Sequence, residues 1–133
     1  MEIASKTKTI QSCFSDCLYE VPNFQRPYSW VDDQLEDYWN DVVLANGDFF
    51  FGTTVTWISE KRPLFHYTYS LIDGQQRLTT SAVALSVIRD LFQVVHDSLS
   101  DDSEDLKVIL LEQKAATQKY LITKDDDFKE YAV

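Results

Sequence analysis

Residues 72–81, IDGQQRLTTS, place an acid, a glycine, two amides, an arginine and two threonines between an apolar run and a long helical pattern. The apolar run predicts a strand that ends at Ile72, and the later periodicity predicts a helix that starts near Gln76. The free N–H groups and the dipole of such a helix attract anions at its first turn. Gly74 permits a sharp turn and close approach of a ligand. The junction therefore has the composition of a phosphate site.

The side chains at this junction suit phosphoryl chemistry. Asp73 could hold a divalent metal such as Mg²⁺ or accept a proton. Gln75 and Gln76 could donate to a phosphate or orient a water molecule. Arg77 opposes the helix dipole in the first turn, so an anionic partner would explain its placement. Two hydroxyl residues follow directly, Thr79 and Thr80.

A purely structural reading of the same residues is equally open. In that reading Asp73 caps the helix, Gly74 makes the turn, and Arg77 pairs with an acid such as Asp37 or Asp41. The stretch is not a P-loop, because the lysine and the spacing of that motif are missing.

A second polar cluster lies in NFQRPYSW, residues 23–30. Pro27 forbids a regular strand there and predicts a structured loop. Gln25 and Arg26 lie among aromatic residues, and arginine beside exposed rings suits a nucleotide, with guanidinium on phosphate and ring on base. Phe24 and Trp30 are expected to fill the core. Arg26 is expected to be functional, because a core does not require it.

The hydrophobic patterns predict an α+β domain in which short strands and longer helices position these two clusters. Helices are expected over residues 8–17, 32–45, 76–96 and 104–122, and strands over 18–22, 49–58 and 66–72. The last two strands should form an antiparallel hairpin, with Gly52 marking a bulge or a close backbone approach. The broad apolar face of the 76–96 helix predicts a largely buried central helix. An acidic loop is expected over 97–105, and a partly ordered loop with half a helix after 122.

Composition limits the function classes. The chain has 133 residues, which predicts a single domain over 1–133, and 44% apolar residues, which suffice for a core. With 12 basic and 22 acidic residues its net charge is -10, which argues against a grip on duplex DNA. Two cysteines and two distant histidines make no zinc framework, so reduced thiols are expected. No signal peptide and no apolar run of membrane-spanning length is evident, so we expect a cytoplasmic protein without membrane contact.

Three stretches occur in a specific order: YEVPNFQRPYSW, FFFGT and LIDGQQRLTT. In this order and near this spacing they resemble the N-terminal domain family of GmrSD-type, modification-dependent restriction proteins. The resemblance runs from about Ile10 to Phe92 and continues weakly to residues 119–122. It implies a ParB/sulfiredoxin-like fold with a small mixed or antiparallel sheet, a β-hairpin and several helices, one of them long and central after the DGQQR turn.

The resemblance also implies a function. It implies nucleoside triphosphate binding and Mg²⁺-dependent hydrolysis, which regulate a nuclease that acts on modified phage DNA. The implied catalytic residues are Asp73, Gln75, Gln76 and Arg77, with Asp73 also the metal ligand. The implied nucleotide-binding residues are Gln25, Arg26, Trp30, Gly74, Arg77, Thr79 and Thr80.

The partner implied by the resemblance is a nuclease domain of the HNH type, either C-terminal or separate, since this chain carries no nuclease motif. Modified DNA would then be reached only indirectly. The chain is expected to be an N-terminal fragment or a short stand-alone member. Two alternatives stay open at this point: a non-enzymatic, ParB-like DNA-recognition or nuclease-regulating switch, and a protein–protein scaffold whose DGQQR loop is structural.

Overall fold

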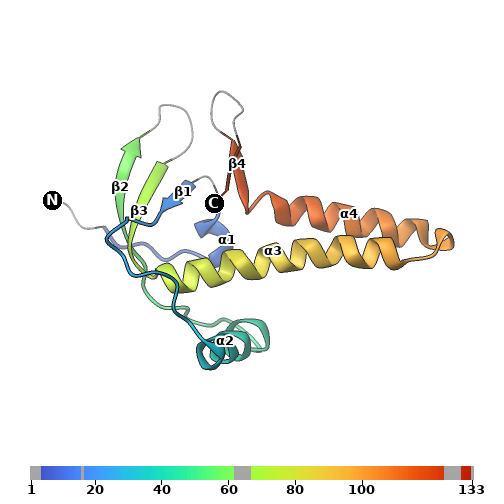
Figure 1. The fold of residues 1–133 in the computed structure, drawn as a ribbon, viewed down its shortest axis with the longest axis horizontal. Coiled ribbons are helices and arrows are strands. Elements are labelled where there is room, and N and C mark those ends of the chain that lie inside the picture. The colour runs from blue at the N-terminus through green and yellow to red at the C-terminus, as the bar shows by residue number, and fades with distance from the viewer. Residues whose placement is uncertain (1–3, 16, 62–66, 125–129, 133) are drawn as a thin grey trace.

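The computed structural model describes residues 4–15, 17–61, 67–124 and 130–132, and it has a mixed α+β fold, as predicted (Figure 1). The helices are α1 (Ile10–Cys13), α2 (Asp32–Tyr38), α3 (Gln75–Ser98) and α4 (Glu104–Gln118), with a π-helical turn η1 (Trp39–Val43) after α2 and a 3₁₀ turn η2 (Asp101–Ser103) before α4. The strands are β1 (Cys17–Glu20), β2 (Val55–Lys61), β3 (Tyr67–Asp73), β4 (Ile122–Lys124) and β5 (Glu130–Ala132).

The main sheet has three strands in the order β1-β3-β2. β1 runs parallel to β3, with Cys17 opposite Tyr67. β2 runs antiparallel to β3, with Val55 opposite Asp73, so the predicted hairpin is confirmed. Its first strand begins at Val55 rather than at residue 49. The preceding FFFGT stretch is not part of the sheet, and its Gly52 and Thr53 contact Arg77 in the first turn of α3.

The core lies where α1, the sheet and the first turns of α3 meet. Phe14, Leu71 and Leu78 form its buried centre, and Ile10, Cys13, Tyr19, Ala82, Leu85 and Tyr120 pack against it. Burial of an aliphatic or aromatic side chain of this size stabilises the fold by about 1.5–3 kcal/mol. Burial beside the thiols of Cys17 and Cys13 also raises the pKa of the Tyr19 phenol well above its usual range, so that this side chain stays neutral.

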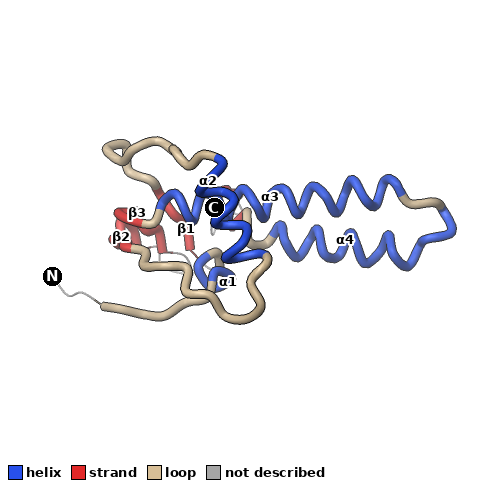
Figure 2. Tube along the Cα trace, turned by 90° about the horizontal axis from the view of Figure 1, so that it is seen from below, coloured by secondary structure: helices blue, strands red, loops and turns tan. Residues whose placement is uncertain are grey.

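Helices α3 and α4 form an antiparallel arm that extends away from the sheet (Figures 1 and 2). Lys114 Nζ donates to Gln93 Oε1 at 2.7 Å, and Arg89 Nη1 donates to Gln118 Oε1 at 3.0 Å, which joins the two helices. The prediction of a largely buried central helix is wrong, because the buried residues of α3 all lie between Gln75 and Ser81. A broad apolar face indicates that burial of that face is favourable. In this structure α4 covers only one side of α3.

Helix α3 is also long and apolar enough to cross a membrane, by length and composition alone. The expectation that the chain holds no run of this kind is therefore wrong. A single helix of this kind is weak support for a membrane span, because a helix that packs against protein shows the same composition.

Three further boundaries differ from the sequence prediction. The acidic segment is mostly helical: α3 continues to Ser98, η2 covers Asp101–Ser103, and α4 begins at Glu104. Acids at the start of α4 suit the positive end of its dipole. The helix expected over 8–17 has only four residues. The C-terminal residues form β5, which pairs antiparallel with β4, in place of half a helix; residues 125–129 of the expected tail lie outside the described residues.

Candidate functional site

The glycine turn joins β3 directly to α3, as the sequence predicted. β3 ends at Asp73, Gly74 adopts the left-handed conformation with φ of +91°, and α3 begins at Gln75. The first helical backbone bond runs from Leu78 N to Gly74 O at 3.1 Å. The N–H groups of residues 75–77 therefore precede the helical ladder, and no side chain caps this end of the helix. The positive end of the helix is therefore uncapped by side chains, at a turn where Gly74, Gln75 and Gln76 are buried.

Two buried glutamines hold the FQRPYSW loop against this helix end. Gln75 Nε2 donates to Arg26 O at 3.3 Å. Gln76 Nε2 donates to Pro27 O at 3.2 Å, while its Oε1 accepts from Ser29 N at 2.8 Å. The two motifs that stand apart in the sequence thus form one structural unit. Predicted roles for these amides at a phosphate or a water molecule stay predictions.

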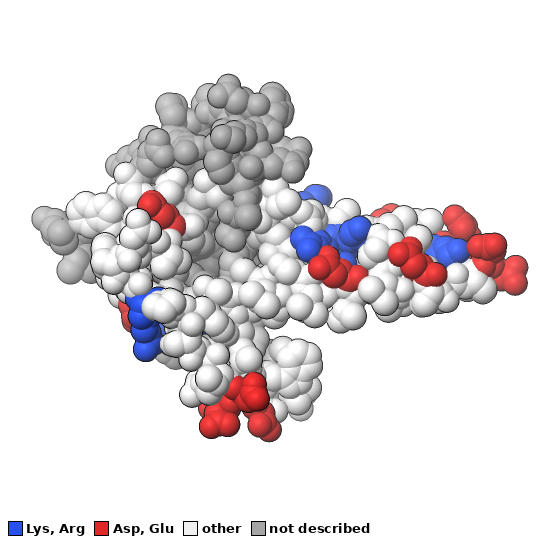
Figure 3. All heavy atoms as spheres, in the orientation of Figure 1, with Lys and Arg blue, Asp and Glu red and all other residues white. Residues whose placement is uncertain are grey.

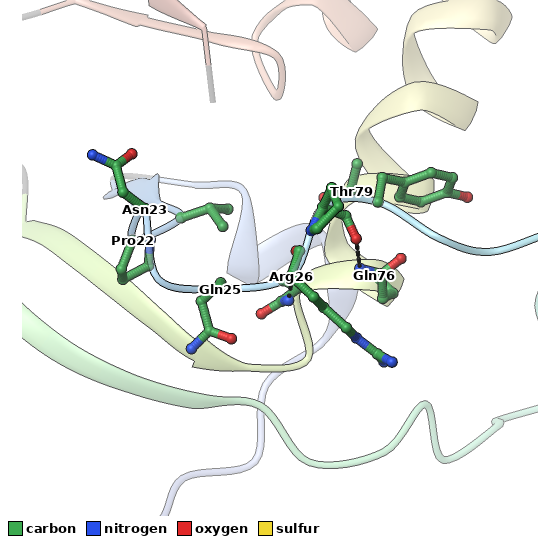
Figure 4. Close-up of a pocket in the computed structure, with 10 residues that line it drawn as sticks. Pro22, Asn23, Gln25, Arg26, Gln76 and Thr79 are labelled. Atoms are coloured by element: carbon green, nitrogen blue, oxygen red, sulfur yellow. Dashed lines mark hydrogen bonds between the residues drawn. The ribbon is translucent and has the colours of Figure 1, made fainter.

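A cavity of about 370 Å³ lies between this loop and the first turns of α3 (Figure 4). Arg26 is exposed beside it, and among the described residues no carboxylate pairs with its guanidinium. Gln25 contributes from the same loop and also anchors it, because its Nε2 donates to Ile72 O at 3.1 Å. The full lining is Val21, Pro22, Asn23, Gln25, Arg26, Pro27, Tyr28, Gln75, Gln76 and Thr79.

Arg77 lies outside the cavity lining and contacts the FFFGT stretch. Its Nη2 donates to Thr53 O at 2.6 Å. Gly52, at φ of +101°, lies so close that a Cβ there would collide with the guanidinium, which confirms the predicted close backbone approach. The structural reading expected an ion pair with Asp37 or Asp41, and the described part of the chain contains no such pair. Arg77 instead joins α3 to the segment before β2.

The other predicted residues divide between the cavity and its surroundings. Thr79 lines the cavity. Thr80 is buried, its Oγ1 donates to Gln76 O, and it pairs with the Tyr28 hydroxyl at 2.9 Å. Trp30 is partly buried near Tyr38, with ring centroids 6.2 Å apart, and is not part of the lining. Phe24 is 78% exposed, so the expectation that it fills the core is wrong. The loop turns its ring outward, because the glutamine bonds hold its backbone against α3.

Some residues that build the site escaped sequence reasoning. Ser29 N and Thr53 O act through backbone atoms, so their side chains gave no signal of this role. Val21 and Pro22 line the cavity through position alone. The order of the three stretches FQRPYSW, FFFGT and DGQQR was the available signal that all three meet.

At this turn the candidate metal ligand is a single carboxylate, that of Asp73. Asp73 is exposed at the end of β3, directly before the uncapped helix. No group of three or more His, Cys, Asp or Glu residues able to hold a metal ion occurs among the described residues. Mg²⁺ is commonly held by one or two carboxylates together with substrate phosphates. Asp73 is one such carboxylate, and it lies outside the cavity lining.

Replacement of Gln76 should release the loop. Gln76→Ala removes both hydrogen bonds to the loop backbone and is expected to destabilise the fold by about 2 kcal/mol. Urea unfolding followed by circular dichroism measures this change. The matched control is Gln113→Ala on the exposed face of α4, which should change stability by less than about 0.5 kcal/mol. Equal stability of the two variants would contradict the role of Gln76.

These features define a class: a small α+β domain in which a glycine turn leads into a long uncapped helix, and a glutamine-anchored loop and the first turns of that helix line an open cavity. The family model described as GmrSD restriction endonuclease, N-terminal domain, matches residues 5–132. The chain belongs to this family, as its motifs predicted, and this places it in a restriction system that serves phage defence. No curated protein sequence matches the chain.

Proposed function

We propose that the cavity beside the start of α3 binds a nucleoside triphosphate and that this binding regulates a nuclease of the restriction system. The observation that carries the proposal is a convergence. The uncapped positive end of a 24-residue helix and the carboxylate-free guanidinium of Arg26 meet at one cavity of about 370 Å³ in the described part of the chain. Both features favour a polyanionic ligand.

In this proposal each group has a distinct task. The N–H groups at the start of α3 and the Arg26 guanidinium hold the phosphates. The Thr79 hydroxyl donates a hydrogen bond to a phosphate oxygen from the cavity wall. Arg77 adds positive charge from the far side of the turn. Asp73 would hold Mg²⁺, which would neutralise phosphate charge when bound. In hydrolysis Gln75 or Gln76 orients the attacking water, and positioning with charge stabilisation supplies most of the rate.

The wider setting is part of the same proposal. The domain is of the ParB/sulfiredoxin-like type and acts in the cytoplasm. Its nuclease partner is of the HNH type, C-terminal or separate, and modified DNA is reached only through that partner. Support for the last point is the net charge of -10, which opposes phosphate contacts by this chain itself.

A thermal-shift panel of ATP, GTP, CTP and UTP, each with and without Mg²⁺, tests the proposal. At least one triphosphate should raise the melting temperature, more so with Mg²⁺, because a ligand that binds only the folded state stabilises it. Calorimetry with the responding nucleotide should then show at least about tenfold weaker binding by Arg77→Ala. Circular dichroism confirms the fold of that variant. Equal affinity in both proteins would remove Arg77 from the site, and no response to any triphosphate would refute the function.

A second candidate, a switch that binds nucleotide without turnover, is favoured by one observation. The amides of Gln75 and Gln76 already bond the loop backbone, which leaves them fewer groups to orient a water molecule. Nucleotide binding would then change conformation or assembly, as in ParB-type clamps. Release of inorganic phosphate separates the two candidates: turnover supports the hydrolase, and saturable binding without phosphate release supports the switch.

A further inference from the structure

The side of α3 that faces away from α4 is an exposed apolar surface. We define it as the outer stripe, whose six residues are each between 43% and 63% exposed: Val83, Val87, Ile88, Leu91, Val94 and Val95. Helical periodicity places these residues opposite Arg89 and Gln93, which bond to α4. In Figure 3 the edge of the arm along α3 is free of charged side chains, which gather instead along the line between the two helices.

Part of the outer stripe has the spacing of a helix-packing seam. Its residues Val87, Leu91 and Val94 follow one another at intervals of four and three residues, and Ala84 and Ser98 continue this spacing beyond the stripe. This is the spacing that brings one face of a helix repeatedly against a second helix. A contiguous apolar surface of this kind on a folded chain marks an interaction site, because its burial is favoured by about 25 cal/mol per Å².

One edge of the outer stripe is acidic. Asp90 and Asp97 are seven residues apart, so they lie on the same side of α3, and their side chains are 65% and 62% exposed. Their hydrogen-bond partners among the described residues lie on α3: Arg89 for Asp90, and His96 and Gln93 for Asp97. The positive charge of Lys114 on α4 also contributes to the lowered pKa of both carboxyls. A docked helix with lysine or arginine along this edge would complement them.

The same acids disfavour two other occupants. A second copy of the chain would bring its own Asp90 and Asp97, together with another net charge of -10, to the contact. A membrane surface is disfavoured because anionic headgroups repel acids, and helices that lie on membranes carry lysine and arginine on their polar face. A membrane crossing would also break the bonds of Gln93 and Arg89 to α4.

We propose that the outer stripe docks an amphipathic helix of a partner protein, with an aliphatic docking face and basic residues along the edge beside Asp90 and Asp97. The contact leaves α3 paired with α4, as it is in this structure. This proposal does not depend on nucleotide binding, because the stripe begins beyond the buried first turns of α3 that adjoin the cavity.

Three synthetic helical peptides of equal length test it by fluorescence anisotropy with the full chain. The basic peptide carries a leucine seam with lysines on its flanks, the acidic peptide replaces the lysines by glutamates, and the scrambled peptide keeps the basic composition without the seam. The basic peptide should bind at least about tenfold tighter than either of the others. Leu91→Asn should weaken it at least about tenfold, whereas Ala115→Asn, at an exposed position on α4, should leave it unchanged.

Further measurements separate the other occupants. Circular dichroism should show that Leu91→Asn stays folded, because Leu91 is 52% exposed. Sedimentation equilibrium should show a monomer, and neither phosphatidylcholine nor phosphatidylglycerol vesicles should retain the chain. Self-association that Leu91→Asn abolishes would overturn the proposal in favour of a second copy. Vesicle binding that the same variant abolishes would overturn it in favour of a membrane. Equal affinity for the basic and scrambled peptides would refute the proposal, because it would show that the apolar seam does not contribute to binding.

Discussion

Arg26→Ala should weaken triphosphate binding by about 10- to 100-fold, which corresponds to the loss of a hydrogen bond to a charged group worth about 1.5–3 kcal/mol. Arg26 has no carboxylate partner among the described residues, and its guanidinium is exposed at the cavity. Its bond to Gln75 uses the backbone oxygen, which still accepts after the substitution. Affinity should therefore fall while the stability of the ligand-free protein stays unchanged. Calorimetry measures the affinity, and thermal unfolding measures the stability.

Arg89→Ala is the matched control for this prediction. It also removes one positive charge, but from α3, where the Arg89 guanidinium bonds Asp90 and Gln118 within the arm. Triphosphate affinity should be unaffected there, because screened charges beyond about 10 Å interact weakly at ordinary salt. Arg26→Lys should fall between the wild type and Arg26→Ala, because lysine keeps the charge and loses the planar fork of donors. Equal losses in Arg26→Ala and Arg89→Ala would show a general charge effect and contradict the assigned site.

Gly74→Ala should destabilise the fold by about 2–5 kcal/mol, from two costs that add. A left-handed backbone costs an alanine about 1–2 kcal/mol, and Gly74 has φ of +91°. An added Cβ would also lie 2.9 Å from Thr54 Oγ1 and 3.3 Å from Thr54 Cα, and overpacking of this kind costs about 1–3 kcal/mol. The midpoint of urea unfolding should shift accordingly.

Gly47→Ala separates the two costs. Gly47 has φ of +118°, but no atom of the described residues lies within 4 Å of the place that an added Cβ would take. Its substitution should therefore carry only the backbone cost of about 1–2 kcal/mol. The difference between the two variants then measures the contact with Thr54. A Gly74→Ala protein as stable as Gly47→Ala would show that the segment before β2 moves aside freely, which would contradict its close packing on the turn.

Local patterns predicted the elements that depend on neighbouring residues. The apolar run ending at Ile72, the glycine and the helical periodicity after it led to the observed β3–turn–α3 unit, and the hairpin of β2 with β3 followed from β-branched and aromatic runs. Boundaries were less accurate where one segment contacts another far away. β2 begins at Val55 because the residues before it pack on Arg77 and Gly74, and no local propensity contains that contact.

The candidate site shows the same division. The residue types at the DGQQR and FQRPYSW stretches already indicated anion chemistry, because a glycine, amides and arginines beside a helix start have few purely local uses. Their partners depended on tertiary packing: Gln76 bonds the backbone of a loop 47 residues away, and Arg77 bonds a carbonyl 24 residues away. Backbone atoms carry no residue-specific signal, so sequence patterns could not reveal these bonds.

The burial of α3 shows most clearly what sequence patterns cannot predict. Periodicity correctly indicated a helix with a wide apolar face, because side-chain spacing follows from helix geometry alone. Which part of that face is covered depends on the direction in which α3 leaves the sheet and on the side taken by α4. Those positions are set by the core around Leu71 and Leu78 and by the bonds of Gln93 and Arg89 to α4. A one-dimensional pattern therefore specifies that the face must meet apolar groups, and three-dimensional packing selects the residues left for a partner.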